Sequence, residues 1–474
     1  MFRPAFLVLL LPACVSPRST GDSLGQLDVP TGWQAGTDVA GSAPAHPDGP
    51  AHAQGWWQDF RRPALTAAIE EAQSGNWDLA GAGYRVRAAA AEARIATGGR
   101  WPALNAGVDL SRSRRNFIGL PVPGAENGVL AVESESHALS LQLSWEADLW
   151  GRLAAGERAA VNSFQAAESD LQAARLSLAG MVTKAWFALG AAGERLELAH
   201  EEAGLAGDGL DIAQARFRAG RAAAGEIHAL EAALSVARQR VGAVEQERKA
   251  SARALELLLG RYPAGVAEVA GIADLPPAVP AGLPAEIVAR RPDLQAADAR
   301  LRAQLAQADQ AEAALYPRLS LTATGGTSTA ELSDLLNGDF KVWSLAAGLT
   351  APVFQAGQLR AGLEASEALA EAARAAFLQS TLVAFSEVEG ALLGESLLRE
   401  QLAFADRALA QARSGHRAAE RRFASGQTNS RELLEARGSV RRAKEARLGT
   451  HLALMLNRVD LYLALGGGFS TESR

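Results

Sequence analysis

The feature that most constrains this chain is a change of hydrophobic period between residues 139 and 181, with no loop between the two patterns. From 139 to 149 apolar residues alternate with polar ones, which predicts a strand with one apolar and one polar face. The apolar set is Leu139, Leu141, Leu143, Trp145, Ala147 and Leu149, and the polar set is Ser140, Gln142, Ser144, Glu146 and Asp148. After Gly151 apolar residues recur at steps of seven, as in a coiled-coil seam, at Phe164, Leu171, Leu178 and Ala185.

The same change of period occurs a second time. Alternation from Trp343 to Ala351 leads into a helical tract after Gly357, which lies 206 residues beyond Gly151. Two later breaks in the helical pattern, at Phe217 and Phe423, are also 206 residues apart. The shared spacing predicts an internally duplicated chain.

These landmarks divide the chain. We expect a signal peptide at 1–13, an irregular tether at 14–55, a first repeat at 56–262, a proline-rich linker at 263–285, a second repeat at 286–468 and a tail at 469–474. Each repeat should carry a β-hairpin, at about 103–149 and 318–352, followed by long helices at about 153–259 and 358–465. Residues 112–136 and 325–338 are expected to connect the strands of the two hairpins.

Bulk composition excludes several classes of protein. A formal net charge of −6 and a pI near 5.8 give no basic surface for nucleic acid. No stretch of 18 apolar residues occurs, which excludes a membrane-spanning helix on length. This criterion does not detect membrane-spanning β-strands, because their apolar residues alternate with polar ones.

The N-terminus predicts export and lipid attachment. Arg3 precedes an apolar segment from Phe6 to Leu11, and Leu11-Pro12-Ala13-Cys14 follows. This arrangement resembles a bacterial lipoprotein signal, in which the cysteine becomes the acylated (palmitate-bearing) N-terminus. An ordinary secretory signal that contains a cysteine is the alternative. The chain has one cysteine, so a disulfide within it is impossible.

Four amphipathic strands are too few to close a barrel, which needs about eight or more. Three chains with four strands each would supply twelve, and the polar faces would then line a water-filled lumen. The long helices are too polar for lipid, so we expect them to form an antiparallel α-barrel in the periplasm. A soluble coiled-coil scaffold would explain the helices but not the strands or the signal.

Several motifs resemble the TolC-like outer-membrane efflux family, in its OprM and NodT-type lipoprotein branch. They are Arg291-Pro292-Asp293-Leu294, Tyr316-Pro317, the segment from Trp145 to Arg152, Pro352-Val353-Phe354 with Gly357, Trp56-Trp57 and the segment from Asp460 to Gly468. The resemblance covers about residues 56–468 and implies a homotrimer. The fold it implies is mainly α, with a 12-stranded transmembrane β-barrel on a periplasmic α-barrel.

The resemblance also implies a function and partners. We expect a passive exit duct for drugs or other small toxic compounds, working with a periplasmic adaptor and an inner-membrane pump of the resistance-nodulation-division type. By resemblance, the helix breaks form the gate and the adaptor contact, at Phe217, Arg218, Gly220, Arg221, Phe423, Gly426, Gln427, Thr428 and Asn429. Relatives carry Val-Asp-Asn after the second tip glycine, whereas this chain has Gln427-Thr428-Asn429. Closure is therefore expected to rest on neutral hydrogen bonds or apolar contacts.

An enzyme is not expected. The seven histidines have no helical ligand spacing, and His200-Glu201 is followed by Gly204 where a zinc protease motif needs histidine. We expect no cofactor beyond the lipid on Cys14 and no metal. The duct of a type I protein secretion system is the alternative to drug efflux, because it uses the same kind of channel.

Overall fold

The computed structural model describes residues 16–19, 32–34, 55–117, 130–277, 287, 289–428 and 430–467. The signal peptide with Cys14, most of the tether, part of the proline-rich linker, Asn429 and the tail lie outside the described residues. The chain forms two compact units, each assembled from segments of both halves. We call them the sheet unit, with residues 1–22, 87–165 and 298–375, and the helix unit, with residues 23–86, 166–297 and 376–474.

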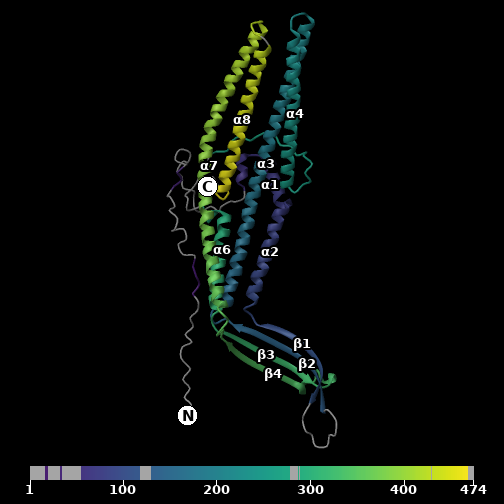
Figure 1. Cartoon of the computed structure of the whole chain (residues 1–474), viewed down its shortest axis with the longest axis vertical. Coiled ribbons are helices and arrows are strands. Elements are labelled where there is room, and N and C mark those ends of the chain that lie inside the picture. The colour runs from purple at the N-terminus through teal and green to yellow at the C-terminus, as the bar shows by residue number, and fades with distance from the viewer. Residues whose placement is uncertain are drawn as a thin grey trace. The chain divides into compact units, whose positions relative to one another are not determined.

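The sheet unit contains one antiparallel sheet in the order β1-β2-β3-β4 (Figure 1). Its strands are β1 (Ala103–Phe117), β2 (Leu130–Ala147), β3 (Arg318–Thr329) and β4 (Lys341–Thr350), with short 3-10 turns at Leu332–Asp334 and Gly338–Phe340 between the last two. The sequence predicted four strands, one hairpin from each repeat. The register pairs Leu104 with Leu143, Leu143 with Ala323 and Ala323 with Leu345.

The strands of both hairpins are longer than predicted. Residues 112–117 and 130–136 belong to β1 and β2, so the expectation of an irregular connection over 112–136 was wrong at both ends. Polar side chains hid this extension, because Arg112 and Arg114 pair across the strands with Glu133 and Glu135 instead of burying apolar surface. In the same way β3 runs on to Thr329, beyond the expected start of the connection at 325.

A short corner joins β2 to the next helix within the sheet unit. Gly151 adopts φ +78°, a conformation that other residues rarely enter, so the chain can turn without a loop. The carboxylate of Asp148 then accepts hydrogen bonds from the backbone N–H groups of Leu153 and Ala154 at 3.1 and 2.8 Å. Trp150 stacks on Tyr316 at 5.1 Å and donates to the Pro317 carbonyl at 2.6 Å, which joins the corresponding corner before β3.

Two helices are 67 residues long, α3 (Arg152–Arg218) and α7 (Gln358–Ala424). Each is followed by a helix of 35 residues, α4 (Ala224–Leu258) and α8 (Ser430–Ala464). The starts of α3 and α7 and of α4 and α8 are 206 residues apart, which confirms the predicted duplication. The starts of the shorter helices α2 (Trp77–Gly98) and α6 (Pro292–Ala313) are 215 residues apart, as are the starts of β1 and β3. Because the helices after the hairpins are only 206 residues apart, the first hairpin is nine residues longer than the second.

The core of the helix unit begins where the sequence predicted order to begin. A 3-10 turn, η2 (Trp56–Phe60), precedes α1 (Pro63–Gly75), and its aromatic side chains are buried. Trp56 stacks on Tyr462 of α8 at 5.1 Å, and Phe60 meets Phe187 of α3 edge to face at 5.0 Å. These contacts join the beginning and the end of the helix unit in sequence.

Among the described helices, α3 alone is long and apolar enough by composition to cross a membrane, with a window of mean hydropathy 1.2, so the exclusion of such a helix on length was wrong for α3. Within the chain 61% of that window is buried. Its apolar residues are therefore largely used in packing against other parts of the chain. The expected seam is only partly buried in the single chain, because Leu178 is buried whereas Phe164, Leu171 and Ala185 are half-buried.

Candidate functional site

The sheet presents two chemically different faces. One row across all four strands is polar, with Asn105, Gln142, Thr324 and Ser344 as successive partners. The neighbouring row is apolar, and its members Leu104 and Leu345 are 65% and 74% exposed. Directly paired residues share a face, so the alternation continues along the sheet. A four-stranded sheet therefore exposes both an apolar face and a polar face.

The two outer strands of this sheet leave hydrogen-bonding groups without a strand partner. In the described sheet β1 pairs only with β2, and β4 only with β3. Every residue of β4 is exposed, including Trp343 at 79%. Unpaired edges beside an exposed apolar face are unfavourable for an isolated soluble sheet, because they invite further strands to pair.

The two predicted helix breaks have the same backbone construction. Gly220 and Gly426 have φ +69° and +73° and follow the ends of α3 and α7. The next residue in each case donates back across the glycine, Arg221 to the Arg216 carbonyl and Gln427 to the Arg422 carbonyl, both at 2.8 Å. This is the Schellman end of a helix, which satisfies carbonyls that the helix leaves open.

A contact between two helices from different repeats lies beside these breaks in the helix unit. The guanidinium carbon of Arg216 in α3 lies 5.2 Å from the ring centroid of Phe423 in α7, a cation–π geometry. Near the second break, both Arg422 and Thr428 bind the carboxylate of Glu432 in the first turn of α8. Arg216, Arg422 and Glu432 were not among the predicted site residues.

The other predicted tip residues lie close by but make fewer contacts. Phe217 and Arg218 end α3, and Phe217 is 45% exposed. Gly220, Arg221, Gly426 and Gln427 are exposed turn residues, and Thr428 is half-buried. The structure thus places the described members of the predicted site at two turns, and the contact from Arg216 to Phe423 joins the two helices that precede them.

The Arg291-Pro292-Asp293 motif has a structural role in the helix unit. Pro292 opens α6, and the buried Arg291 contacts Asp293 at 2.7 Å, Glu387 at 2.6 Å and the Ala464 carbonyl at 3.2 Å. Burial alone would raise the pKa of Asp293, but the hydrogen bond and charge of Arg291 lower the pKa below its ordinary value. The motif therefore joins α6, α7 and the end of α8.

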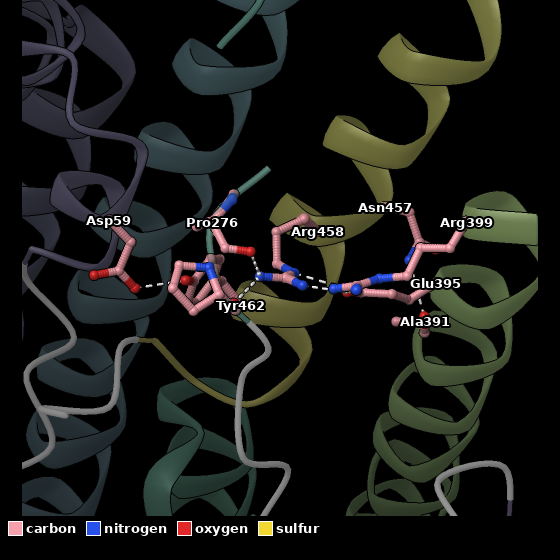
Figure 2. A network of polar contacts seen from close by, with 9 residues as sticks. Asp59, Pro276, Ala391, Glu395, Arg399, Asn457, Arg458 and Tyr462 are labelled. Atoms are coloured by element: carbon pink, nitrogen blue, oxygen red, sulfur yellow. Dashed lines mark hydrogen bonds and ion pairs between the residues drawn. The ribbon is translucent and has the colours of Figure 1, made fainter. Parts of the chain in front are cut away.

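A second polar network of the helix unit surrounds Arg458 (Figure 2). The Arg458 guanidinium is fully buried and binds Glu395 of α7, with Nε to Oε2 at 2.9 Å, and it also donates to the Pro276 carbonyl at 3.1 Å. Its neighbour on α8, Tyr462, donates to Asp59 at 2.5 Å. Burial raises the pKa of Tyr462, so the hydroxyl keeps its proton. The network fixes the segment after α4 against α7 and α8.

Metal chemistry has no support in the described ranges, where three or more possible metal-binding side chains do not come together. The buried carboxylate of Glu395 is bound by Arg458 and Arg399. The predicted lipid site, Cys14, lies outside the described residues.

Comparison with known proteins gives the family. A family model described as outer membrane efflux protein matches residues 68–261 and 283–467. The pyoverdine export outer membrane protein OpmQ of Pseudomonas putida is 33% identical, over 98% of this chain and 97% of that protein. The outer-membrane channel OprN has a TM-score of 0.83 at 27% identity, covering 96% of this chain and all of that one. The Campylobacter jejuni CmeC outer membrane channel has a TM-score of 0.82 at 25% identity, covering 90% of each chain. The chain therefore belongs to the outer membrane efflux protein family.

Proposed function

We propose that three copies of this chain form the outer-membrane exit duct of a tripartite efflux system. The carrying observation is the sheet, which has an apolar face, a polar face and two edges without partners. Pairing β4 of one copy with β1 of the next would close twelve strands and leave no edge. The apolar face would then meet lipid and the polar face would line a lumen.

Efflux of small toxic compounds or drugs is the activity that suits this duct. A polar lumen without a built binding site selects weakly, so an upstream pump of the resistance-nodulation-division type would choose the substrate and a periplasmic adaptor would connect it. The relatives support this proposal, because OpmQ is named for pyoverdine export and TtgC for toluene efflux. The family consists of channel proteins, and the chain is not an enzyme.

The outer membrane is the location that the family supports, and we propose that acylated Cys14 also anchors the chain there. We also propose that the two repeats span residues 56–262 and 286–468, the limits that the sequence predicts. Mass spectrometry of the mature N-terminus tests the anchor. Acylation at Cys14 is expected, whereas an unmodified cysteine or a start elsewhere would contradict it.

We propose that the duct closes at the two helix breaks. The supporting contacts are Arg216 on Phe423 and the binding of Glu432 by Arg422 and Thr428. Closure would then rest on contacts within each chain, together with Gln427 and the other predicted tip residues. The sequence predicted closure by neutral hydrogen bonds or apolar contacts. Under this proposal a charged contact would be added to them, because Arg422 and Glu432 form an ion pair.

Single-channel recording tests the gate. Arg422→Gln removes an ion pair between half-exposed side chains, worth at most about 1 kcal/mol, from each of the three copies. The ratio of open to closed channels should therefore rise by up to about fivefold for each copy. Arg431→Gln is the matched control, since Arg431 pairs with Glu435 one turn further along α8. An unchanged open fraction in Arg422→Gln, or an equal rise in the control, would contradict the gate.

Efflux itself is tested in a strain that lacks this chain and every other outer-membrane channel that the same pump could use. Restoring the chain should lower the accumulation of a fluorescent drug, and the effect should disappear when the cognate pump is deleted. Export of a protein substrate through an ABC exporter, with no change in drug accumulation, would favour type I secretion instead. Release of the chain from cells without detergent would indicate a soluble scaffold.

A further inference from the structure

The apolar face of the sheet ends in positive charge on two strands. In β1 the residues on that face are Leu104, Ala106, Val108 and Leu110, followed by Arg112 and Arg114. In β4 the same face carries Leu349, Ala347, Leu345 and Trp343, followed by Lys341 at the end nearest the hairpin turn. Both strands thus pass from apolar to cationic toward the end of the sheet that is opposite the corner with α3.

The distance along the strand places the arginines at a defined level. Arg112 and Arg114 lie about 27 and 34 Å from Leu104 along β1, at about 3.4 Å per residue. With a strand tilt of about 40°, these distances correspond to heights of about 21 and 26 Å. The lipid-facing apolar band of an outer-membrane barrel is about 25 Å tall. The two arginines therefore fall at its outer boundary.

The arginines are held in place yet keep free hydrogen-bond donors. Arg112 uses Nε toward Glu135 and Nη2 toward Glu133, both at 3.1 Å, and Arg114 reaches Glu133 at 3.5 Å. A guanidinium has five N–H donors, so these contacts leave several unused. The Arg112 and Arg114 side chains are 71% and 66% exposed. Glu133 and Glu135 lie on the same face and offset the charges of the two arginines, so a further anionic ligand would use the N–H donors that these contacts leave free.

We propose that Arg112, Arg114 and Lys341, the outer basic belt, bind phosphate groups of lipopolysaccharide in the outer leaflet. This inference rests on the proposed outer-membrane barrel, in which the hairpin turns face the exterior and β4 of one copy adjoins β1 of the next. Each junction would then place Lys341, which the register sets in the row of Thr327, Leu139 and Val108, on the strand next to Arg112 and Arg114. Arginine and phosphate form charge-assisted bidentate hydrogen bonds, which suits the phosphorylated headgroup of that lipid.

Cross-strand ion pairing alone is the simpler role for the arginines. It would stabilise the hairpin to the same extent whatever lipid surrounds it. It does not account for Lys341, which follows the last apolar residue of this face on a different strand. The two roles differ in one measurable respect, because only the belt makes lipid binding depend on the phosphates.

The test uses the full-length trimer purified in detergent and titrated with fluorescent lipopolysaccharide. The variant Arg112→Gln/Arg114→Gln/Lys341→Gln should raise Kd tenfold or more, and Lys341→Gln alone by about threefold. Arg115→Gln is the matched control: Arg115 adjoins Arg114 in β1, but on the opposite face. Its Kd should stay within twofold of wild type. Dephosphorylated lipopolysaccharide should bind at least tenfold more weakly to the wild-type protein.

An unchanged Kd in the triple variant, an equal loss in Arg115→Gln, or equal binding of dephosphorylated lipid would overturn the belt. If millimolar inorganic phosphate displaces the lipopolysaccharide, phosphate alone is sufficient for binding. If it does not, and the other results hold, the rest of the lipid molecule also contributes to binding. Channel conductance of each variant is recorded in parallel. If the wild-type protein shows no channel conductance and no β-sheet signal in circular dichroism that heating abolishes, the duct itself is overturned. If conductance is intact but the triple variant has the Kd of wild type, only the belt is overturned.

Discussion

At the scale of single residues, the buried pair of Arg458 and Glu395 is the most demanding feature of the helix unit. Both side chains are almost fully buried, so each charge depends on the other. Burial opposes ionisation of Glu395, but the hydrogen bonds and charges of Arg458 and Arg399 lower its pKa below the ordinary value. Removing one partner of such a pair leaves an uncompensated charge in the interior.

We therefore expect Arg458→Ala to lower the free energy of unfolding by about 3–5 kcal/mol. Arg399→Ala is the control, because Arg399 pairs with the same carboxylate from a side chain that is 43% exposed, and it should cost less than about 1 kcal/mol. Loss of helical circular dichroism in urea measures both. Equal costs would show that burial of Arg458 is energetically unimportant.

Glu256 gives a pH dependence of known sign. Backbone N–H groups of Gly265, Ala267 and Val266 donate to its carboxylate, and these bonds lower the pKa of Glu256 despite its burial. A lowered folded-state pKa stabilises the protein above the ordinary pKa, and this contribution is lost as pH falls through the folded value. Urea unfolding should therefore show Glu256→Gln less stable than wild type at pH 7. The difference should shrink below about pH 4, and a pH-independent difference would contradict the assignment.

At the scale of helices and turns, the glycines at the two breaks differ from those inside helices. Gly426 has φ +73°, so a side chain there strains the backbone, and Gly426→Ala should cost about 1 kcal/mol. Gly415 lies inside α7 with open space where a Cβ atom would stand, so Gly415→Ala should stabilise by about 0.5–1 kcal/mol. Thermal unfolding of the two variants should shift in opposite directions. Shifts in the same direction would contradict the strained turn.

Elements set by local pattern were predictable, whereas contacts between distant residues were not. Gly151 and Gly426 marked turns because few other residues adopt their backbone angles. Alternation located β2 from Leu139 onward but missed its first residues, because Glu133 and Glu135 are stabilised by arginines of the partner strand. Arg458 looked like one helix arginine among many, since its partners Glu395 and Pro276 are 63 and 182 residues away.

At the scale of the whole molecule, the sheet makes the assembly testable through adjacent residues with opposite environments. Leu345 belongs to the apolar row and Ser344 to the polar row, one position apart on β4. A charge facing lipid costs up to about 2–4 kcal/mol, depending on its depth, whereas a lumen-facing charge stays in water. Leu345→Arg should therefore reduce the amount of heat-resistant trimer in outer-membrane fractions severalfold. Ser344→Arg should assemble normally and lower cation conductance by placing three positive charges around the lumen, so equal assembly of the two variants would mean that the faces are not lipid and water.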